Sequence, residues 1–220
     1  MKCYIAKRNV LDRLFRVFVF VLLSAPQADA GPRLGPKLDL FLSNFSEALP
    51  GNFKRGKLRD ENLTNFAIRH NSINSYKDKI EIVKEHNFNI QSQRDPRFYQ
   101  YRIAARFIDG TALWYFNRKP ARLSSAGGFL YANGYYYFNT GEGDPLPFAH
   151  VTKLRSLGNG EYHVTTREYA SHDTSEYNPA QWRRRKIEVF DQGRASAIIK
   201  ETGKGTQRRL ILLEYQRFPK

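Results

Sequence analysis

Four glycine-containing turn signals in the second half of the chain restrict its fold more than any other feature. They are Asn133-Gly134, Gly158-Asn159-Gly160, Asp191-Gln192-Gly193 and Gly203-Lys204-Gly205. Each separates runs rich in aromatic and β-branched residues, and Asn-Gly between such runs is a strong hairpin signal. Strands joined by short turns pair antiparallel. The sequence therefore predicts a curved antiparallel meander sheet of about six strands.

The first half of the chain carries apolar residues at helical spacing. One stripe predicts a helix that ends at Pro50-Gly51, and a second predicts a helix with Asp60 as its N-cap. The stripes are Leu38, Phe41, Leu42, Phe45 and Leu49, and Leu63, Phe66, Ala67, His70 and Ile73. N-terminal helices packed on such a sheet give the fold class α+β, with a cavity expected between helices and sheet. His70 on the apolar face has two interpretations: a hydrogen-bonded core histidine or a ligand-binding residue.

Two middle segments have mixed patterns. Residues 80–91 suggest one or two short strands. Residues 99–107 alternate like a strand, with Asp109-Gly110 as a hairpin turn, but Ala105, Ile108 and Ala112 fit a helix. The pattern alone does not decide between a hairpin and a helix over residues 104–117.

Four motifs in a fixed order resemble exported bacterial proteins of unknown role: residues 66–71, 114–117, 131–138 and 157–164. In those proteins the segment corresponding to 114–117 ends a helix. The resemblance therefore implies an α+β protein with a strand near 99–103 and a helix near 104–117, and it carries no catalytic residues. Residues 109–115 are also similar to a strand-turn-strand segment of periplasmic lipoprotein carriers, which would imply a hairpin there and a cavity for acyl chains.

The N-terminus has the three parts of a secretory signal peptide. Basic residues precede the apolar run 17–23, and Ala28-Asp29-Ala30 is a small-x-small cleavage site. The run is too short to span a bilayer, and a buried N-terminal helix is the alternative. We expect residues 1–30 to be removed, leaving one domain, 31–220, in the periplasm or secreted, without a transmembrane span. The single cysteine, Cys3, would leave with the signal, which excludes disulfides and Cys-ligated metals.

Catalytic and cofactor motifs are absent from the sequence, so we expect no cofactor and no metal. There is no G-x-S-x-G, H-E-x-x-H or EF-hand pattern. The acidic loop 141–144 and the histidines His150, His163 and His172 have no spacing that demands a cation. The chain is better interpreted as a binding protein than as an enzyme.

A formal charge of +15 directs attention to anionic partners. The densest basic cluster supplies the candidate binding residues Trp182, Arg183, Arg184 and Arg185, followed by Lys186. Export makes nucleic acid an unlikely partner, which leaves anionic lipids, acidic glycans or a small ligand. The alternative interpretation is a surface that only solubilises the protein.

One candidate catalytic pair comes from strand register. If Gly158-Asn159-Gly160 is a three-residue loop, Ser156 faces Tyr162, Leu154 faces Val164, and His150 faces Glu168. An inward His-carboxylate pair would serve as a general base or simply satisfy two polar groups. The sequence therefore favours an exported, non-enzymatic binding protein. The alternatives are a cavity enzyme that uses His150 and Glu168, or a carrier of an acyl ligand.

Overall fold

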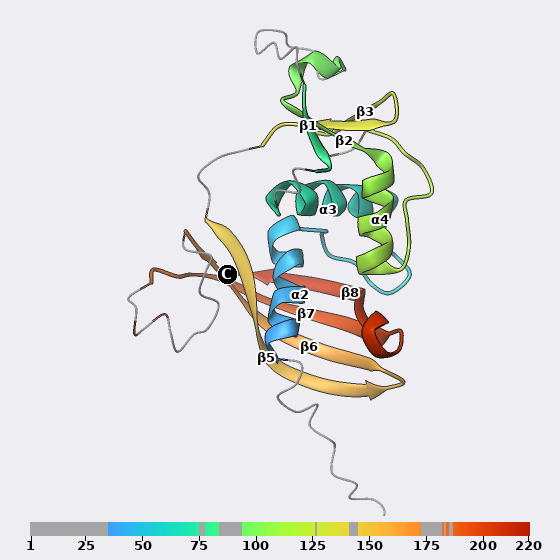
Figure 1. The fold of residues 1–220 in the computed structure, drawn as a ribbon. Coiled ribbons are helices and arrows are strands. Elements are labelled where there is room, and N and C mark those ends of the chain that lie inside the picture. Colours follow the sequence, from blue (N-terminus) through green and yellow to red (C-terminus); the bar gives the residue numbers. More distant parts are fainter. Residues whose placement is uncertain are drawn as a thin grey trace, which may run out of the picture.

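The fold consists of helices packed against two antiparallel sheets (Figure 1). The computed structural model describes residues 35–74, 78–83, 94–125, 127–140, 145–172, 182, 184 and 187–220. The predicted signal peptide, the acidic loop 141–144, Arg183, Arg185 and Lys186 lie outside these residues. Within them, no helix has the length and apolar character needed to cross a membrane. The α+β class is confirmed.

The large sheet is a four-stranded meander in the order β5-β6-β7-β8. Its strands are β5 (Leu146–Gly158), β6 (Glu161–Ser171), β7 (Phe190–Thr202) and β8 (Arg209–Pro219), with a short 3-10 helix, η2 (Gly205–Gln207), before β8. The predicted turns at 158–160 and 203–205 join consecutive strands. The predicted turn at 191–193 is wrong, because β7 runs straight through it.

A β-bulge explains the missing turn. Glu168 on β6 pairs with Gly193 and Tyr169 pairs with Asp191, which leaves Gln192 as an extra residue in β7. Gly193 has a φ of +112°, and a Cβ placed there would lie 2.4 Å from the carbonyl oxygen of Phe218. A glycine is required for this close approach, and the same Asp-x-Gly pattern would serve a turn.

The small sheet has the order β1-β2-β4-β3. It consists of β1 (Ile80–Ile82), β2 (Tyr101–Ala104), β3 (Leu130–Ala132) and β4 (Tyr135–Phe138), with η1 (Pro96–Phe98) before β2. The Asn133-Gly134 hairpin is confirmed, but the strands that it joins, β3 and β4, belong to the small sheet and not to the meander. The expectation of one sheet of about six strands is therefore wrong, because the described residues form two sheets of four strands each.

Three α-helices are described: α2 (Gly35–Ala48), α3 (Asp60–Ile73) and α4 (Ala105–Phe116). The strand-then-helix interpretation of 99–117 is confirmed, and the hairpin alternative is wrong. Asp60 is not the N-cap of α3; Arg59 occupies that position without a side-chain cap. The Asp60 carboxylate instead pairs with Arg118 and accepts the backbone N–H of Ala121.

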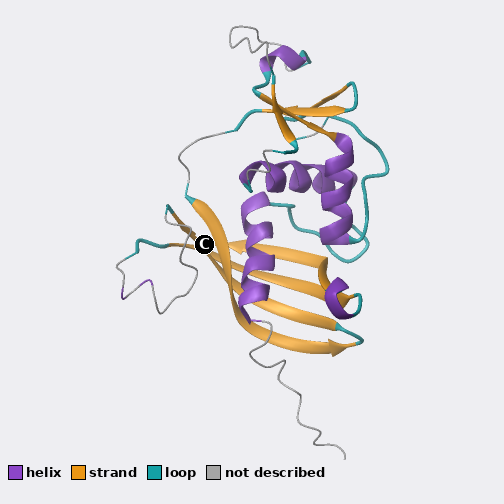
Figure 2. Cartoon of the chain, viewed as in Figure 1, coloured by secondary structure: helices purple, strands orange, loops and turns teal. Residues whose placement is uncertain are grey.

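Side chains fill the space between α2 and the large sheet. Figure 2 shows α2 lying across one face of that sheet, with α3 and α4 between it and the small sheet. Phe45 is fully buried at the centre, 5.0 Å between ring centroids from both Phe41 and Phe66, and 6.1 Å from Tyr215 on β8. Leu49, predicted as part of the stripe, is 40% exposed and has left the helix.

Both outer edges of the large sheet are covered by side chains or backbone from the N-terminal half. On β5, Ser43 of α2 accepts the N–H of Ala149, and Asp39 accepts the N–H of Val151. Alternate residues of β5 direct their backbone N–H groups away from the sheet, and the next such residue, Pro147, has no N–H to satisfy. On β8, Phe53 forms two backbone hydrogen bonds with Tyr215, of 2.9 and 3.0 Å. An open strand edge invites pairing with other chains, and both edges are blocked at these positions.

Candidate functional site

The predicted pairing of His150 with Glu168 is not formed. The predicted three-residue loop is wrong, because Gly158 pairs with Glu161 and leaves Asn159-Gly160 as a two-residue loop. An extra residue at Leu157 restores the predicted pairs Ser156/Tyr162 and Leu154/Val164, but a second extra residue, at Thr152, shifts the register by one. His150 therefore pairs with Arg167, and Ala149 pairs with Glu168. A one-residue slip moves a side chain to the other face of a strand, so the dyad is wrong.

Glu168 is a buried structural carboxylate. Its side chain is fully buried beneath α2 and accepts hydrogen bonds from three groups. The Ser46 hydroxyl donates to Oε1 at 2.9 Å, the Tyr215 hydroxyl donates to the same oxygen, and the Arg217 guanidinium donates to Oε2. Burial, and the negative charge of Glu168, raise the pKa of Tyr215 above its usual range. A carboxylate so enclosed has no route to a substrate.

His150 has a different carboxylate partner, on α2. Its Nδ1 lies 2.9 Å from Oδ2 of Asp39, while Oδ1 of Asp39 accepts the N–H of Val151 at 2.7 Å. The His150 side chain is one-third exposed. This pair fixes α2 along the edge of β5, a contact that strand register within the sheet could not predict.

His70 is a buried core histidine. Its ring stacks on Phe66 and packs edge-on against Tyr115, with centroids 5.6 and 4.7 Å apart. The Asn74 amide lies 3.1 Å from Nδ1. Burial, assisted by the positive charge of Lys79, lowers the pKa of His70 to about 4. The imidazole is therefore neutral at pH 7, and it also lines a hollow of about 350 Å³ beside α4.

Trp182 packs against the large sheet. Its ring meets Tyr169 and Phe148 edge-on, at centroid distances of 4.8 and 5.5 Å. Phe148 and Tyr169 form a cross-strand pair between β5 and β6, two residues from the His150/Arg167 pair. They project from the face opposite to Ala149 and Glu168, which lie against α2. Trp182 thus packs on the face of the sheet opposite α2. Arg184, two residues further along the chain, is exposed.

The face of the large sheet opposite α2 carries a group of basic residues that we call the basic sheet face. Lys153 and Arg155 project from β5 on either side of the inward Leu154, and Arg167 projects from β6. Arg194 on β7 lies directly opposite Arg167. The basic sheet face comprises Lys153, Arg155, His163, Arg167 and Arg194. Sequence analysis missed these residues, although basic side chains at i and i+2 around an apolar residue are the signal for them.

The acidic residues of this face include Glu161, at the turn end of the strands, and Glu214, which lies in one cross-strand row with Arg155 and His163. Glu161 pairs with Arg55 at 2.7 Å and with Lys200 at 3.6 Å. The hydrogen bond from Arg55 lowers the pKa of Glu161. Near the arginines, Asp191 lies 3.7 Å from Arg167, whose side chain is still 59% exposed. Among the described residues, no carboxylate pairs with Lys153, Arg155 or Arg194. The basic sheet face therefore keeps an excess of positive charge.

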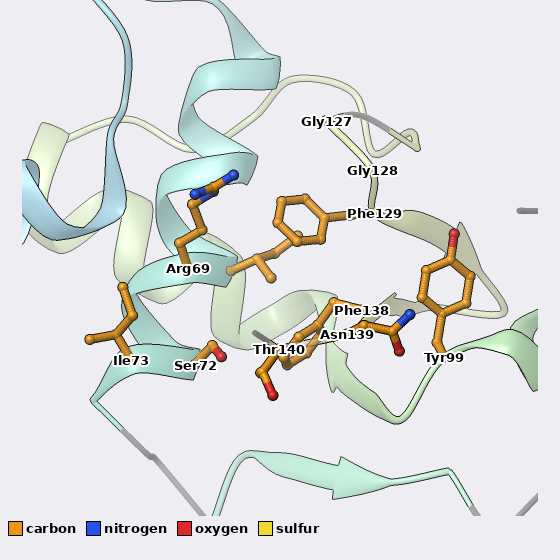
Figure 3. A pocket seen from close by; sticks show the side chains of 11 residues that line it. Arg69, Ser72, Ile73, Tyr99, Gly127, Gly128, Phe129, Phe138, Asn139 and Thr140 are labelled. Carbon is orange, nitrogen blue, oxygen red and sulfur yellow. The ribbon is translucent and has the colours of Figure 1, made fainter. Parts of the chain in front are cut away.

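A hollow of about 390 Å³ lies between α3 and the small sheet. Figure 3 shows the Arg69 side chain and the Phe129 ring at its border, with Tyr99 and Asn139 across from them. Asn139 is already engaged, because its side chain accepts the N–H of Gln100 and donates to the carbonyl of Phe98. Arg69 is the one charged residue among its described lining, which makes this hollow a weaker anion site than the basic sheet face.

Comparison with known proteins identifies no relative. No family model matches the chain, and no curated protein or solved structure matches it. Within the described residues there is no group of three or more His, Cys, Asp or Glu side chains arranged to hold a metal ion. Functional inference therefore depends on the geometry of this chain.

Proposed function

We propose that this protein is an exported, non-enzymatic binding protein whose basic sheet face holds an acidic glycan. The observation that carries the proposal is the cross-strand pair Arg167 and Arg194. Like charges directly opposite each other destabilise a sheet, and the one carboxylate beside this pair, Asp191, lies 3.7 Å from Arg167, so a bound anion would offset more of the repulsion. Sites of this kind attract extended anions over a distance set by salt.

The spacing of the basic residues suits a chain with repeated charges. Neighbouring strands lie about 4.8 Å apart and alternate residues of a strand about 6.8 Å apart, so the cations form a regular array. Lys153 and Arg155 extend this array along β5, and the exposed Arg184 follows Trp182 by two residues in the chain. A linear polymer that follows the strands would meet several cations at once.

The groups between the cations favour a glycan over a lipid surface. Thr165, Ser196 and Gln216 form one cross-strand row on this face. These side chains offer hydrogen bonds to sugar hydroxyls. A membrane-binding face needs several aromatic or aliphatic groups free to insert. Here Trp182 packs edge-on against Phe148 and Tyr169, and Phe218 is a single exposed ring beside Arg194. Anionic lipid is therefore the competing outcome of the test.

The experiment is salt elution from an immobilised sulfated polysaccharide such as heparin. The variant Arg167→Ser/Arg194→Ser is expected to elute at clearly lower salt than the unaltered protein. The control Lys57→Ser/Lys119→Ser makes the same change in net charge at exposed positions outside the sheet. If both variants elute together, total charge and not the basic sheet face governs binding. Stronger binding to anionic vesicles than to heparin would identify lipid as the partner.

A further inference from the structure

Trp114 is a large aromatic side chain left open to solvent. It projects from the last turns of α4 and is 54% exposed. The guanidinium carbon of Arg209, on β8, lies 5.5 Å from the centre of its ring. Contacts between Arg and Trp faces are favourable, and here the contact joins a helix to a sheet.

A cleft of about 580 Å³ opens beside Trp114, between the end of α4 and the connection from β7 to β8. Clefts of this size are typical of small-ligand sites. Its described lining is Trp114, Asn117, Thr202, Gly203, Thr206, Gln207 and Arg209. Apart from Gly203, every one of these residues has a side chain with a hydrogen-bonding group, which in Trp114 is the indole N–H.

Arg209 holds the two walls of the cleft together. Its guanidinium donates to the carbonyl oxygen of Leu113 at 3.2 Å and to Oδ1 of Asn117 at 2.8 Å. Both acceptors are on the C-terminal end of α4, whereas Arg209 begins β8. The cleft is thus formed before any ligand arrives, which lowers the entropy lost on binding.

The second wall depends on a tight turn. Gly203 has a φ of +84°, and a Cβ there would lie 2.3 Å from the carbonyl oxygen of Gln207. Only a glycine allows the chain to turn this closely, and the turn brings Thr206 and Gln207 to the cleft. A larger residue at 203 would push this wall out of place.

The chemistry of the cleft fits a sugar ring. The face of an indole packs against the C–H groups of a sugar, and amide and hydroxyl side chains bond its hydroxyls. The cleft lining includes no carboxylate among the described residues, and its single cation, Arg209, already donates to neutral oxygens. A ligand recognised mainly through charge, such as a phosphate, would find little here.

We infer that this cleft binds one sugar unit of a glycan, packed against the part of the Trp114 indole that Arg209 leaves exposed and hydrogen-bonded by Asn117 and Gln207. The inference goes beyond the proposed function, because the ligand needs no charge and the basic sheet face takes no part. Binding at Trp114 should therefore persist at high salt, where the proposed acidic-glycan binding is lost.

Tryptophan fluorescence tests the inference. The chain has two tryptophans, so Trp182→Phe leaves Trp114 as the only reporter. The probes are three neutral trisaccharides: maltotriose, cellotriose and chitotriose. We expect at least one of them to produce a saturable change in about 1 M NaCl, where charges are screened beyond roughly 3 Å. No saturation with any probe up to about 10 mM, well above the Kd of a weak millimolar complex, overturns the inference.

Variants separate this site from the basic sheet face. By calorimetry, Gln207→Ala and Trp114→Ala should each weaken trisaccharide binding about tenfold or more, equivalent to about 1.4 kcal/mol. Arg167→Ser/Arg194→Ser should leave it unchanged. Trp114 is half exposed, so its removal preserves the fold, which circular dichroism would verify. Unchanged affinity in both cleft variants would overturn the inference whatever the result on heparin.

Discussion

The hydroxyl of Ser43 accepts a hydrogen bond of 3.0 Å from the backbone N–H of Ala149, across an interval of 106 residues. Both residues are buried. One turn earlier on α2, Asp39 binds the N–H of Val151 in the same way. The helix thus acts as a partner strand would, by satisfying alternate N–H groups along the edge of β5.

Removing the Ser43 hydroxyl should destabilise the fold. Ser43→Ala leaves the buried N–H of Ala149 without its partner, which costs about 1–3 kcal/mol. Urea unfolding would measure the loss. Asn44→Ala is the matched control on the same helix, because its amide bonds only the exposed carbonyl of Leu40 and the part-buried carbonyl of Phe41. Equal stability of the two variants would show that Ser43 does not protect the strand edge.

Truncating Glu168 should cost stability without affecting glycan binding. Glu168→Ala leaves Arg217 without its carboxylate and the Tyr215 hydroxyl without its acceptor. The expected loss is about 2–3 kcal/mol, below the usual cost of breaking a buried pair because Arg217 is 23% exposed. Chemical unfolding measures this loss, and heparin elution should not change. Altered elution with full stability would mean that Glu168 takes part in binding.

Glu47 should make the fold less stable as the pH rises. Burial raises the pKa of this carboxyl from 4.5 to about 7. The unfolded chain therefore loses its proton first, and stability falls between pH 4.5 and 7 by up to about 3 kcal/mol. Glu47→Gln removes this loss, so the variant should gain stability relative to the unaltered protein over that interval. Unfolding curves at several pH values measure the gain. Glu61→Gln is the control, because it makes the same substitution at an exposed position.

His70 should have the opposite effect at acid pH. Its pKa is lowered from 6.5 to about 4, so the unfolded chain takes up a proton that the folded chain excludes. Stability present above pH 6.5 is lost as the pH falls toward 4, by on the order of 3 kcal/mol. His70→Gln lacks this proton uptake and should show a flatter acid limb in thermal unfolding scans. Identical acid limbs would mean that the imidazole is charged in the folded protein.

The sequence predicted local elements well and their assembly poorly. The stripe through Leu38, Leu42 and Phe45 marked α2, and Asn133-Gly134 marked its hairpin, because each pattern depends on neighbours along the chain. Asp191-Gln192-Gly193 was misread as a turn, since only the pairing with β6 distinguishes a turn from a bulge there.

The candidate site followed the same rule. Trp182 and the adjacent arginines were recognisable as a cluster from their positions in the sequence. The Arg167 and Arg194 pair was not predicted, because it depends on the register between β6 and β7. The bulge at Thr152 similarly places Arg167, and not the predicted Glu168, opposite His150. No local sequence pattern indicates this change of register.

The order of elements along the chain has a consequence for synthesis. A growing chain leaves the ribosome N-terminus first, so α2 emerges about a hundred residues before β5, the strand that it protects. Phe53 likewise emerges long before its partner Tyr215 on β8. At these positions, both edges of the large sheet therefore have their covering residues already synthesised when β5 and β8 emerge. The N-terminal half of the domain thus protects the strand edges of the second half against pairing with other chains during folding.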